Sequence, residues 1–318
     1  MIDRYQLRYF LAVVDHGNFT RAADACSVSQ PTLSVGIAKL EQSLGTRLFQ
    51  RNSRRVRLTQ AGSGFLAHAR RIESEFNLAE RALSDKSADP PLRVGVLRSL
   101  PGAWLARIVA EMQRIDADAQ VEFVEGSERE LHAHLSRGRV DCALTLVERG
   151  SDRFLEEPLY EEGYALALAA GHPLAGESQV AAEALGDAVM LLRPHCEALS
   201  ETSRHFTDRG VRPHFAFRST NDERVLELVA AGLGVTVMPE GFVHPQVARP
   251  HLLGFDARRT IGLAYGPAFD QPDSAPSAVI AAIRSTVGQE GRAVAMSNGR
   301  SASRDLAAQF ASRGSSPV

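Results

Sequence analysis

The adjacent residues His195 and Cys196 carry the most reactive pair of side chains in this sequence. They follow the apolar segment AVMLL and open a segment, from about Cys196 to Arg209, that we predict to be a helix. A helix amino terminus lowers the pKa of a thiol, and the thiolate is the form that reacts with peroxide. The pair therefore indicates a redox-active thiol. The alternative is that Cys196 is a small apolar side chain in a pocket wall, as free cysteines usually are.

A thiol enzyme that uses Cys196 as nucleophile and His195 as base is a more distant hypothesis. Adjacent side chains seldom point at each other, and no Asp or Asn that would orient the base is identifiable from the sequence. The three cysteines, Cys26, Cys142 and Cys196, are odd in number and lack the CxxC spacing of a zinc site. The glycine motifs that bind phosphates are also absent. We expect no enzyme activity, no metal site and no cofactor.

Hydroxyl, amide and basic side chains are concentrated between Phe19 and Thr59. Side chains of these types bind the base edges and the phosphates of DNA. The residues that we expect at base edges are Thr20, Ser29, Gln30, Pro31, Thr32, Ser34 and Val35. The residues that we expect at phosphates are Lys39, Arg51, Arg54 and Arg55.

Two short helices and a pair of strands would position these side chains. The segment from Phe19 to Cys26 predicts a helix, SVSQ predicts a turn, and a second helix begins near Pro31, because proline is favoured in a first helical turn. Four apolar residues of the second helix recur every three or four positions and share one buried face: Leu33, Ile37, Leu40 and Leu44. RLFQR and VRLT predict two strands of a basic wing around NSRR. Residues 1–58 are therefore predicted to form a winged helix-turn-helix domain.

Charge is divided unevenly along the chain, although the formal net charge is only −2. Residues 1–58 contain nine Lys or Arg and four Asp or Glu, a net charge of +5, whereas residues 91–318 contain 23 and 29, a net charge of −6. A basic amino-terminal segment followed by an acidic remainder of the chain favours double-stranded DNA as the partner of residues 1–58.

The next segment has the pattern of a long helix with one apolar stripe. The stripe consists of Phe65, Ala69, Ile72, Phe76, Ala79 and Leu83, spaced alternately by four and three residues. This spacing is typical of a coiled coil, so we expect the stripe to be the seam between two subunits; the alternative is packing against the chain's own body. The segment SDKSADPP then ends the helix. Residues 59–90 are assigned to this linker helix and a hinge.

Beyond residue 91 short apolar segments alternate with helical ones. The predicted strands are LRVGVL, QVEFVE, DCALTL, YALALA, AVMLL, HFAFR, GVTVMP and RRTIGLAY. Helices are expected near Gly102–Arg114, Ser127–Arg137, Cys196–Arg209 and Asn221–Ala231, with SAVIAAIRSTV as the last. This order is typical of an α/β fold with a mostly parallel sheet. Residues 289–318, rich in Ser, Ala, Arg and Gly, are expected to be a disordered tail.

The amino-terminal part resembles the DNA-binding domain of LysR-type transcriptional regulators. The resemblance rests on Leu7, Phe10, Phe19, Ala22, Ala23, Ser29, Gln30, Pro31, Ser34, Leu40, Glu41, Leu44, Gly45, Leu48, Phe49, Arg51, Thr59 and Gly62. It implies a bacterial transcription regulator that binds promoter DNA as a homodimer or homotetramer. It also implies a two-lobed effector domain, similar to periplasmic binding proteins, over residues 91–288. Lobe I would consist of residues 91–162 and 267–288, and lobe II of residues 163–266, with crossings near Glu162 and Gly266.

The resemblance implies a small-molecule effector in the cleft between the lobes. Loops at the carboxyl ends of strands are expected to line such a cleft, and those that precede helices offer free N–H groups to an anion or a polar oxygen. The expected effector-binding residues are Arg98, Ser99, Leu100, Ser127, Glu128, His195, Cys196, Thr220 and Asn221. Arg98 and Arg193 would favour a carboxylate, whereas neighbouring acidic residues oppose one.

The segment MLLRPHCEALSETSRHF resembles the redox segment of the peroxide-sensing branch of this family, with His195 and Cys196 at the reactive pair. The chain departs from that branch at three positions: His205 replaces the resolving cysteine, Gly266 replaces an arginine, and Glu128 replaces a threonine. We therefore expect a regulator controlled by a small-molecule effector, and keep a thiol-based oxidant sensor acting through Cys196 as the alternative.

The sequence contains no run of about 18 apolar residues that would predict a membrane span. Its amino terminus, MIDRYQLRYF, does not have the order of charged and apolar residues found in a signal peptide. We expect a cytoplasmic protein without a membrane partner.

Overall fold

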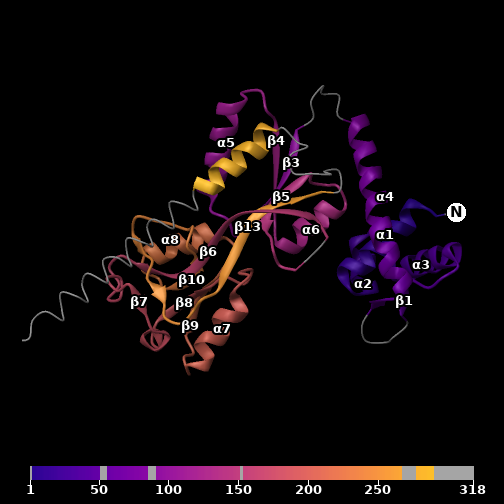
Figure 1. Ribbon diagram of the computed structural model, residues 1–318. Coiled ribbons are helices and arrows are strands. Elements are labelled where there is room, and N and C mark those ends of the chain that lie inside the picture. The colour runs from indigo at the N-terminus through magenta and orange to yellow at the C-terminus, as the bar shows by residue number, and fades with distance from the viewer. Residues whose placement is uncertain (1, 51–55, 85–90, 151–152, 267–276, 290–318) are drawn as a thin grey trace, which may run out of the picture.

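The computed structural model describes residues 2–50, 56–84, 91–150, 153–266 and 277–289. A small helical domain at one end is followed by one long helix and then by a larger α/β domain (Figure 1). Gln289, expected in the tail, is the last residue of a helix over residues 278–289, and the remainder of the expected tail lies outside the described residues.

The small domain is built on α1 (Arg4–His16), α2 (Phe19–Ala25) and α3 (Gln30–Leu44). Each helix begins at a side-chain cap, since Asp3, Asn18 and Ser29 accept hydrogen bonds from backbone N–H groups of the first turn. The side chains of Phe10 and Leu33 are fully buried between the helices. These contacts confirm the predicted helix-turn-helix.

The wing is a two-stranded antiparallel pair, β1 (Phe49–Gln50) with β2 (Arg57–Leu58). Its predicted tip lies outside the described residues, and with it the predicted phosphate contacts Arg51, Arg54 and Arg55.

The long helix α4 (Gln60–Ser84) uses its apolar stripe in two ways. Ala69 is fully buried and Phe65 packs edge-on against Phe10, with 5.2 Å between ring centroids. Placing these two residues in an intersubunit seam was therefore wrong, because the first half of the helix completes the core of its own winged domain. Ile72 and Phe76 are 39% and 44% exposed, respectively, and stay available to a partner.

The rest of the predicted seam gives less information. Ala79 is exposed, and the side chain of Leu83 lies outside the described part of the chain. The intersubunit seam therefore remains a prediction, now confined to the second half of α4.

Three strands of the α/β domain confirm the parallel βαβ order. β3 (Leu92–Leu97) lies between β4 (Val121–Gly126) and β5 (Cys142–Leu146) and is parallel to both. Between them run α5 (Gly102–Ile115) and α6 (Glu128–Ser136). In Figure 1, α5 lies beside the helix of residues 278–289, whereas α6 lies on the side that faces α4.

The parallel sheet predicted from the first three strands is confirmed, and the strands that follow make the whole sheet mixed. The 15-residue strand β6 (Leu155–Ala169) pairs antiparallel with β13 (Arg258–Tyr265) along its first half. Its second half pairs with β10 (Thr236–Pro239), β11 (Val247–Ala248) and β12 (His251–Leu252). β6 thus runs through both lobes and has antiparallel neighbours in each lobe.

The two lobes meet where β6 changes partners. Gly163 is the last β6 residue paired with β13, and Tyr164 is the first paired with β10. All of β13 pairs with β5 or with the first half of β6, so it already belongs to lobe I. The expected return near Gly266 was therefore wrong, because the chain re-enters lobe I by Arg258.

Three further strands and three helical segments also belong to lobe II. These are β7 (Gln179–Val180), the short helix η1 (Ala182–Leu185), β8 (Val189–Leu192), α7 (Leu199–Asp208), β9 (His214–Arg218) and α8 (Asp222–Ala230). β8 and β9 form their own two-stranded sheet, and α7 lies next to them in Figure 1.

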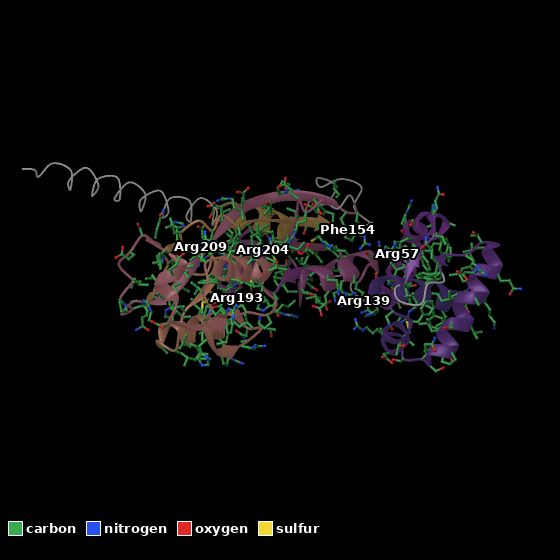
Figure 2. The ribbon with its side chains drawn as sticks, turned by 90° about the horizontal axis from the view of Figure 1, so that it is seen from below. Arg57, Arg139, Phe154, Arg193, Arg204 and Arg209 are labelled. Atoms are coloured by element: carbon green, nitrogen blue, oxygen red, sulfur yellow. The ribbon has the colours of Figure 1, made fainter. Side chains whose placement is uncertain are left out.

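An ion pair connects the winged domain with lobe I. Arg137, at the end of α6, donates to Asp15 of α1 at 2.8 Å, and Arg70 of α4 lies 3.5 Å from the same carboxylate. Figure 2 shows the neighbouring Arg139 at this junction, whereas Arg193, Arg204 and Arg209 lie in lobe II. The DNA-binding end and the effector domain are therefore in polar contact within one chain.

Candidate nucleic-acid interface and effector site

The outward face of α3 presents the residues predicted to read DNA. Gln30, Pro31, Thr32, Val35 and Lys39 are exposed. Because no apolar neighbour covers Val35, which is 54% exposed, its methyl groups are free to contact a thymine methyl.

Polar side chains at the start of α3 are held by one another. Gln30 Nε2 donates to Ser34 Oγ at 3.0 Å, and the hydroxyls of Ser29 and Thr32 are 2.7 Å apart. Ser29 Oγ also accepts from the backbone N–H of Thr32, so it caps the helix. Thr20 is exposed at the start of α2. The structure therefore confirms that this face is exposed and adds that Ser29 has a capping role, while its contact with DNA stays a prediction.

A buried arginine organises the boundary between the lobes. The Arg259 side chain, 2% exposed, binds Glu162 Oε1 through Nε at 2.8 Å and through Nη2 at 2.6 Å. Arg259 Nη2 also donates to the backbone oxygen of Ser99 and Nη1 donates to the Ser99 hydroxyl, both at 2.9 Å. Such multiple charge-assisted hydrogen bonds compensate the cost of burying the guanidinium.

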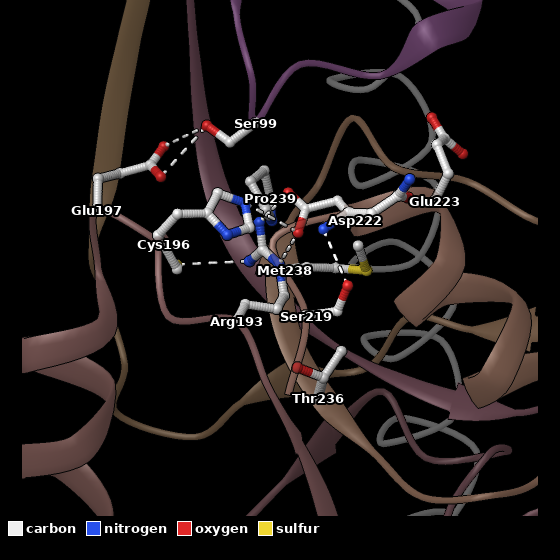
Figure 3. A network of polar contacts seen from close by, with 12 residues as sticks. Ser99, Arg193, Cys196, Glu197, Ser219, Asp222, Glu223, Thr236, Met238 and Pro239 are labelled. Carbon is white, nitrogen blue, oxygen red and sulfur yellow. Dashed lines mark hydrogen bonds and ion pairs between the residues drawn. The ribbon is translucent and has the colours of Figure 1, made fainter. Parts of the chain in front are cut away.

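Glu197 connects this network of hydrogen bonds to lobe II. Ser99, in the loop after β3, donates to Glu197 at 3.3 Å (Figure 3), and Arg259 Nη1 contacts the same carboxylate. Burial alone raises the pKa of Glu197, but the charge and hydrogen bond of Arg259, a backbone N–H and the charge of Arg193 together outweigh burial, so that pKa lies below its ordinary value. An ionised carboxylate from lobe II is therefore bound to two groups of lobe I.

A polar cavity of about 370 Å³ adjoins this network. Its charged and hydroxyl side chains are Glu148, Arg149, Tyr164, Glu197, Glu201, Arg258, Arg259 and Thr260. A cavity of this size and lining suits a small polar ligand.

Cys196 lies in a turn, and its sulfur contacts an arginine. Arg193 Nη1 donates to Cys196 Sγ at 3.4 Å, while Nε and Nη2 of the same guanidinium bind Asp222 at 2.6 and 2.5 Å (Figure 3). The expectation that the charge of Arg193 would favour a carboxylate ligand was wrong, because this side chain is buried and neutralised by Asp222. Cys196 precedes α7, which begins only at Leu199.

The expectation of a low thiol pKa at Cys196 was also wrong. Burial raises this pKa and outweighs the opposing charge of Arg193. His195 Nε2 lies 3.2 Å from Asp222, and its Nδ1 has no hydrogen-bond partner among the described residues.

The other two cysteines lie in different parts of the fold. Cys142 is fully buried in β5 of lobe I, and Cys26 caps the end of α2. His205, at the position of the resolving cysteine, is buried against Phe255 with ring centroids 5.3 Å apart. Within the described residues, Cys196 therefore has no sulfur partner in its own lobe.

Several residues that were predicted to bind the effector contact other residues of the protein. Leu100 is buried in the hydrophobic core of lobe I, so its expected place in the cleft was wrong. Arg98 binds Glu125 at 3.1 Å, and Ser127 caps α6. Glu128 lies 3.4 Å from Arg149.

The loop before α8 also differs in part from expectation. Asn221 caps α8 by accepting from the backbone N–H of Arg224 at 2.8 Å, and Thr220 is exposed. Three residues of the predicted effector set therefore lie close to the interlobe network. Ser99 contacts Glu197, and His195 and Cys196 lie in the turn just before Glu197.

Sequence reasoning missed Arg259 and Glu162 as site residues, and treated Glu197 only as an unfavourable charge. The available signal was a charged residue inside an apolar strand: Arg259 begins the buried part of RRTIGLAY, and Glu162 precedes the run GYALALA. Charged side chains are almost never fully buried unless they are paired, so each implied a partner of opposite charge without showing which residue it was.

Family models match two separate segments of this chain. The LysR substrate binding domain matches residues 86–287, and the bacterial regulatory helix-turn-helix protein of the lysR family matches residues 5–63. The chain belongs to the LysR family. It is a DNA-binding transcription regulator with an amino-terminal helix-turn-helix and an effector domain.

Two relatives of this chain share about a third of its residues. The DNA-binding transcriptional dual regulator OxyR of Escherichia coli K12 is 33% identical over 271 residues, covering 82% of this chain and 88% of that protein. The probable hydrogen peroxide-inducible genes activator of Mycobacterium avium is 33% identical over 278 residues, covering 84% and 89%.

Solved structures of OxyR proteins share the fold. A full-length OxyR variant from Pseudomonas aeruginosa matches with a TM-score of 0.53 and 25% identity, covering 89% of this regulator and 98% of that chain. An OxyR mutant from Corynebacterium glutamicum matches with a TM-score of 0.52 and 26% identity, covering 94% and 97%. Among the described helices of the regulator, none combines the length and the apolar character that a bilayer crossing requires.

Proposed function

We propose that this LysR-family regulator responds to a small polar effector that enters the interlobe cleft and competes with Glu197. The observation that carries the proposal is the bridge from Glu197 of lobe II to Ser99 and Arg259 of lobe I. An effector carboxylate, or another oxygen acceptor, would take over the donors that Glu197 now uses. The lobes would then be free to change their relative orientation, since one carboxylate no longer joins them.

Ligand replacement of this kind is energetically reasonable. Arg259 keeps its paired bonds to Glu162 in either state, so its charge never becomes unpaired inside the protein. Glu197 is the mobile partner, because it lies in the turn before α7 and at the edge of the polar cavity. A ligand shifts such an equilibrium only by its differential affinity for the two states.

The response would reach promoter DNA through the subunit assembly. The exposed Ile72 and Phe76 of α4 offer an apolar strip for a second copy, and the polar contact of Arg137 with Asp15 connects lobe I to the winged domain. We propose a homodimer or homotetramer in which lobe orientation sets the spacing of recognition helices on DNA.

The test is the variant Glu197→Ala, with Glu201→Ala as its matched control in the same cavity. Glu201 is exposed, and its carboxylate accepts a hydrogen bond from the hydroxyl of the neighbouring Ser200 at 2.8 Å. Genomic fragments retained by the purified protein supply the DNA for footprinting. Glu197→Ala should alter the footprint and the small-angle scattering profile without any effector, whereas Glu201→Ala should match the parent. Identical footprints and profiles for all three proteins would reject the Glu197 bridge as the control element.

A second candidate is oxidant sensing by a single cysteine. It is favoured by the 33% identity to hydrogen peroxide-inducible genes activators and by the Cys196–Arg193 contact. The Cys196 thiolate would attack one oxygen of hydrogen peroxide, forming an S–O bond as the O–O bond breaks. The departing hydroxide takes up a proton to become water, and the sulfur becomes a sulfenic acid. A small thiol would then displace water to give a mixed disulfide.

The raised pKa of Cys196 predicts a slow reaction in this candidate. Mass spectrometry after dilute peroxide should find one added oxygen at Cys196 before any at Cys26, and Cys196→Ser should lose the response of DNA binding to peroxide. Equal oxidation of both cysteines, with unchanged DNA binding, would reject it. A thiol enzyme has weaker support, because the Cys196 sulfur contacts Arg193 while His195 lies against Asp222.

A further inference from the structure

Lobe II contains a second cavity, of about 440 Å³, on the other side of the turn that carries Cys196 and Glu197. It lies between α7 and the strands β8, β9 and β10. Its lining includes Arg193 and Cys196 but neither Glu197 nor any residue of lobe I, so it is separate from the polar interlobe cavity.

The walls of this cavity are mainly apolar. Met190, Val211 and Val237 are nearly fully buried and belong to the hydrophobic core of lobe II. From α7 the walls include Leu199 and Phe206, which lie seven residues apart and therefore on one helix face. The exposed residues Ser203 and Phe215 lie at its outer end. A pocket of about 150 Å³ with apolar walls is enough to bind benzene, so this one can hold a larger molecule.

The polar groups in the inner part of the cavity already have partners. Thr202 Oγ1 donates to the backbone oxygen of Ala198 and Thr236 Oγ1 to that of Leu191, both at 2.8 Å. The Arg193 guanidinium is neutralised by Asp222, and its third nitrogen contacts Cys196 Sγ and the backbone oxygen of Val237. Arg212 also lines the cavity, but it is exposed, so water screens its charge. An anion that enters the inner part would therefore lose its hydration without gaining a donor there.

We propose that this cavity is a binding site for a small uncharged aromatic or aliphatic molecule. Burial of apolar surface supplies the affinity, and a hydroxyl or N–H of the ligand can bind the lone pairs of the threonine oxygens. This chemistry differs from that of the interlobe cleft, whose lining is charged, so the two sites accept different ligands.

The position of the cavity gives its occupant a route to the interlobe network. Cys196 lines the cavity, and the next residue, Glu197, binds Ser99 and Arg259 on the other side of the turn. A ligand that displaces α7 or this turn changes the position of the Glu197 carboxylate. This coupling rests on the proposed role of Glu197, whereas the existence of the binding site does not.

Calorimetric titration of the full-length protein with indole tests the site, and indole-3-carboxylate serves as the charged analogue. Indole should bind with one site per chain, and the carboxylate should bind at least tenfold more weakly. Thr202→Phe places a ring in the cavity and should abolish indole binding. Ser200→Phe adds the same ring to an exposed position of α7 outside the cavity lining and should leave binding intact.

A second measurement locates the ligand and does not depend on one variant. Indole should slow the alkylation of Cys196 by N-ethylmaleimide, followed by peptide mass spectrometry, while Cys26 reacts at an unchanged rate. If Thr202→Phe does not fold, Ser203→Phe at the outer end provides the same test.

Three results would overturn the site: no binding of indole, equal binding of indole-3-carboxylate, or binding that persists in both phenylalanine variants of the cavity. If indole binds as expected but the footprint of the parent protein on DNA does not change, the site stands and its coupling to Glu197 is wrong.

Discussion

Glu41 of the recognition helix accepts a hydrogen bond from the backbone N–H of Leu48 at 2.7 Å through Oε1. The same oxygen accepts from the N–H of Phe49 at 3.2 Å, so one carboxylate holds the start of the wing against α3. Leu48 is fully buried and Phe49 nearly so, which leaves these N–H groups no water as a substitute partner.

Glu41→Ala should therefore destabilise the winged domain. Each buried N–H that loses its partner costs about 1–3 kcal/mol, and urea unfolding measures the sum. Ser43→Ala, at an exposed position of the same helix, should change stability by less than about 0.5 kcal/mol. The two variants should also differ in DNA affinity, because only Glu41→Ala releases the wing. Equal unfolding midpoints would show that the carboxylate does not hold it.

Lys39 and Gln30 should affect DNA binding in different ways. Both are exposed on α3, but Lys39 offers a charge and Gln30 an amide for a base edge. Lys39→Ala should weaken binding to every sequence and reduce the slope of log affinity against log salt by about 0.9. Gln30→Ala should reduce discrimination between operator and unrelated DNA, with little change in the slope. Gel-shift titrations at several salt concentrations distinguish these outcomes, and a changed slope for Gln30→Ala would refute the assignment.

Phe76 is the residue of α4 at which dimerisation is best tested. It is 44% exposed, and the Arg4 guanidinium lies 4.9 Å from its ring centroid. Phe76→Glu would bury an unpaired carboxylate in a subunit seam, at a cost of several kcal/mol, and should split the assembly while each domain stays folded. Light scattering measures the mass, and Glu75→Gln at the exposed neighbouring position is the control. A variant that keeps the mass of the parent would exclude Phe76 from the seam.

The buried pair of Arg193 and Asp222 predicts a loss of stability in acid. Burial raises the pKa of Asp222, but the hydrogen bonds and charges of Arg193 and His195 together outweigh burial and lower this pKa to about 2. An unperturbed aspartate has a pKa of about 3.9. Because the folded-state pKa is the lower one, the stabilisation is fully present above pH 4 and is lost as the pH falls towards 2.

Thermal unfolding of the parent and of Asp222→Asn across this range tests the prediction. The variant lacks the titrating carboxyl and should be less stable at neutral pH, because Arg193 is then buried without a counter-ion. The difference in stability between the two proteins should shrink below about pH 4. A difference that stays constant down to pH 2 would mean that Asp222 does not titrate in this range.

The sequence alone determined the order of the parts of this regulator and which face of α3 is exposed. Both follow from local patterns: capping residues, the three-and-four spacing of Leu33 and Ile37, and the alternation of apolar strands with helices. It also identified Ser99 and Cys196 as residues near the interlobe boundary. Their positions follow from strand ends, because residues that follow parallel strands gather at one edge of a sheet.

Only the tertiary structure decided what those residues contact. Arg259 and Glu162 are 97 positions apart, and antiparallel pairing of β13 with β6 makes them neighbours. Pairing across such a distance has no signature in local sequence. For the same reason the helical spacing of Phe65, Ala69 and Phe76 could not show that the first two lie against the chain's own winged domain. The spacing defines one face of a helix, but the surfaces that cover that face are set by the rest of the fold.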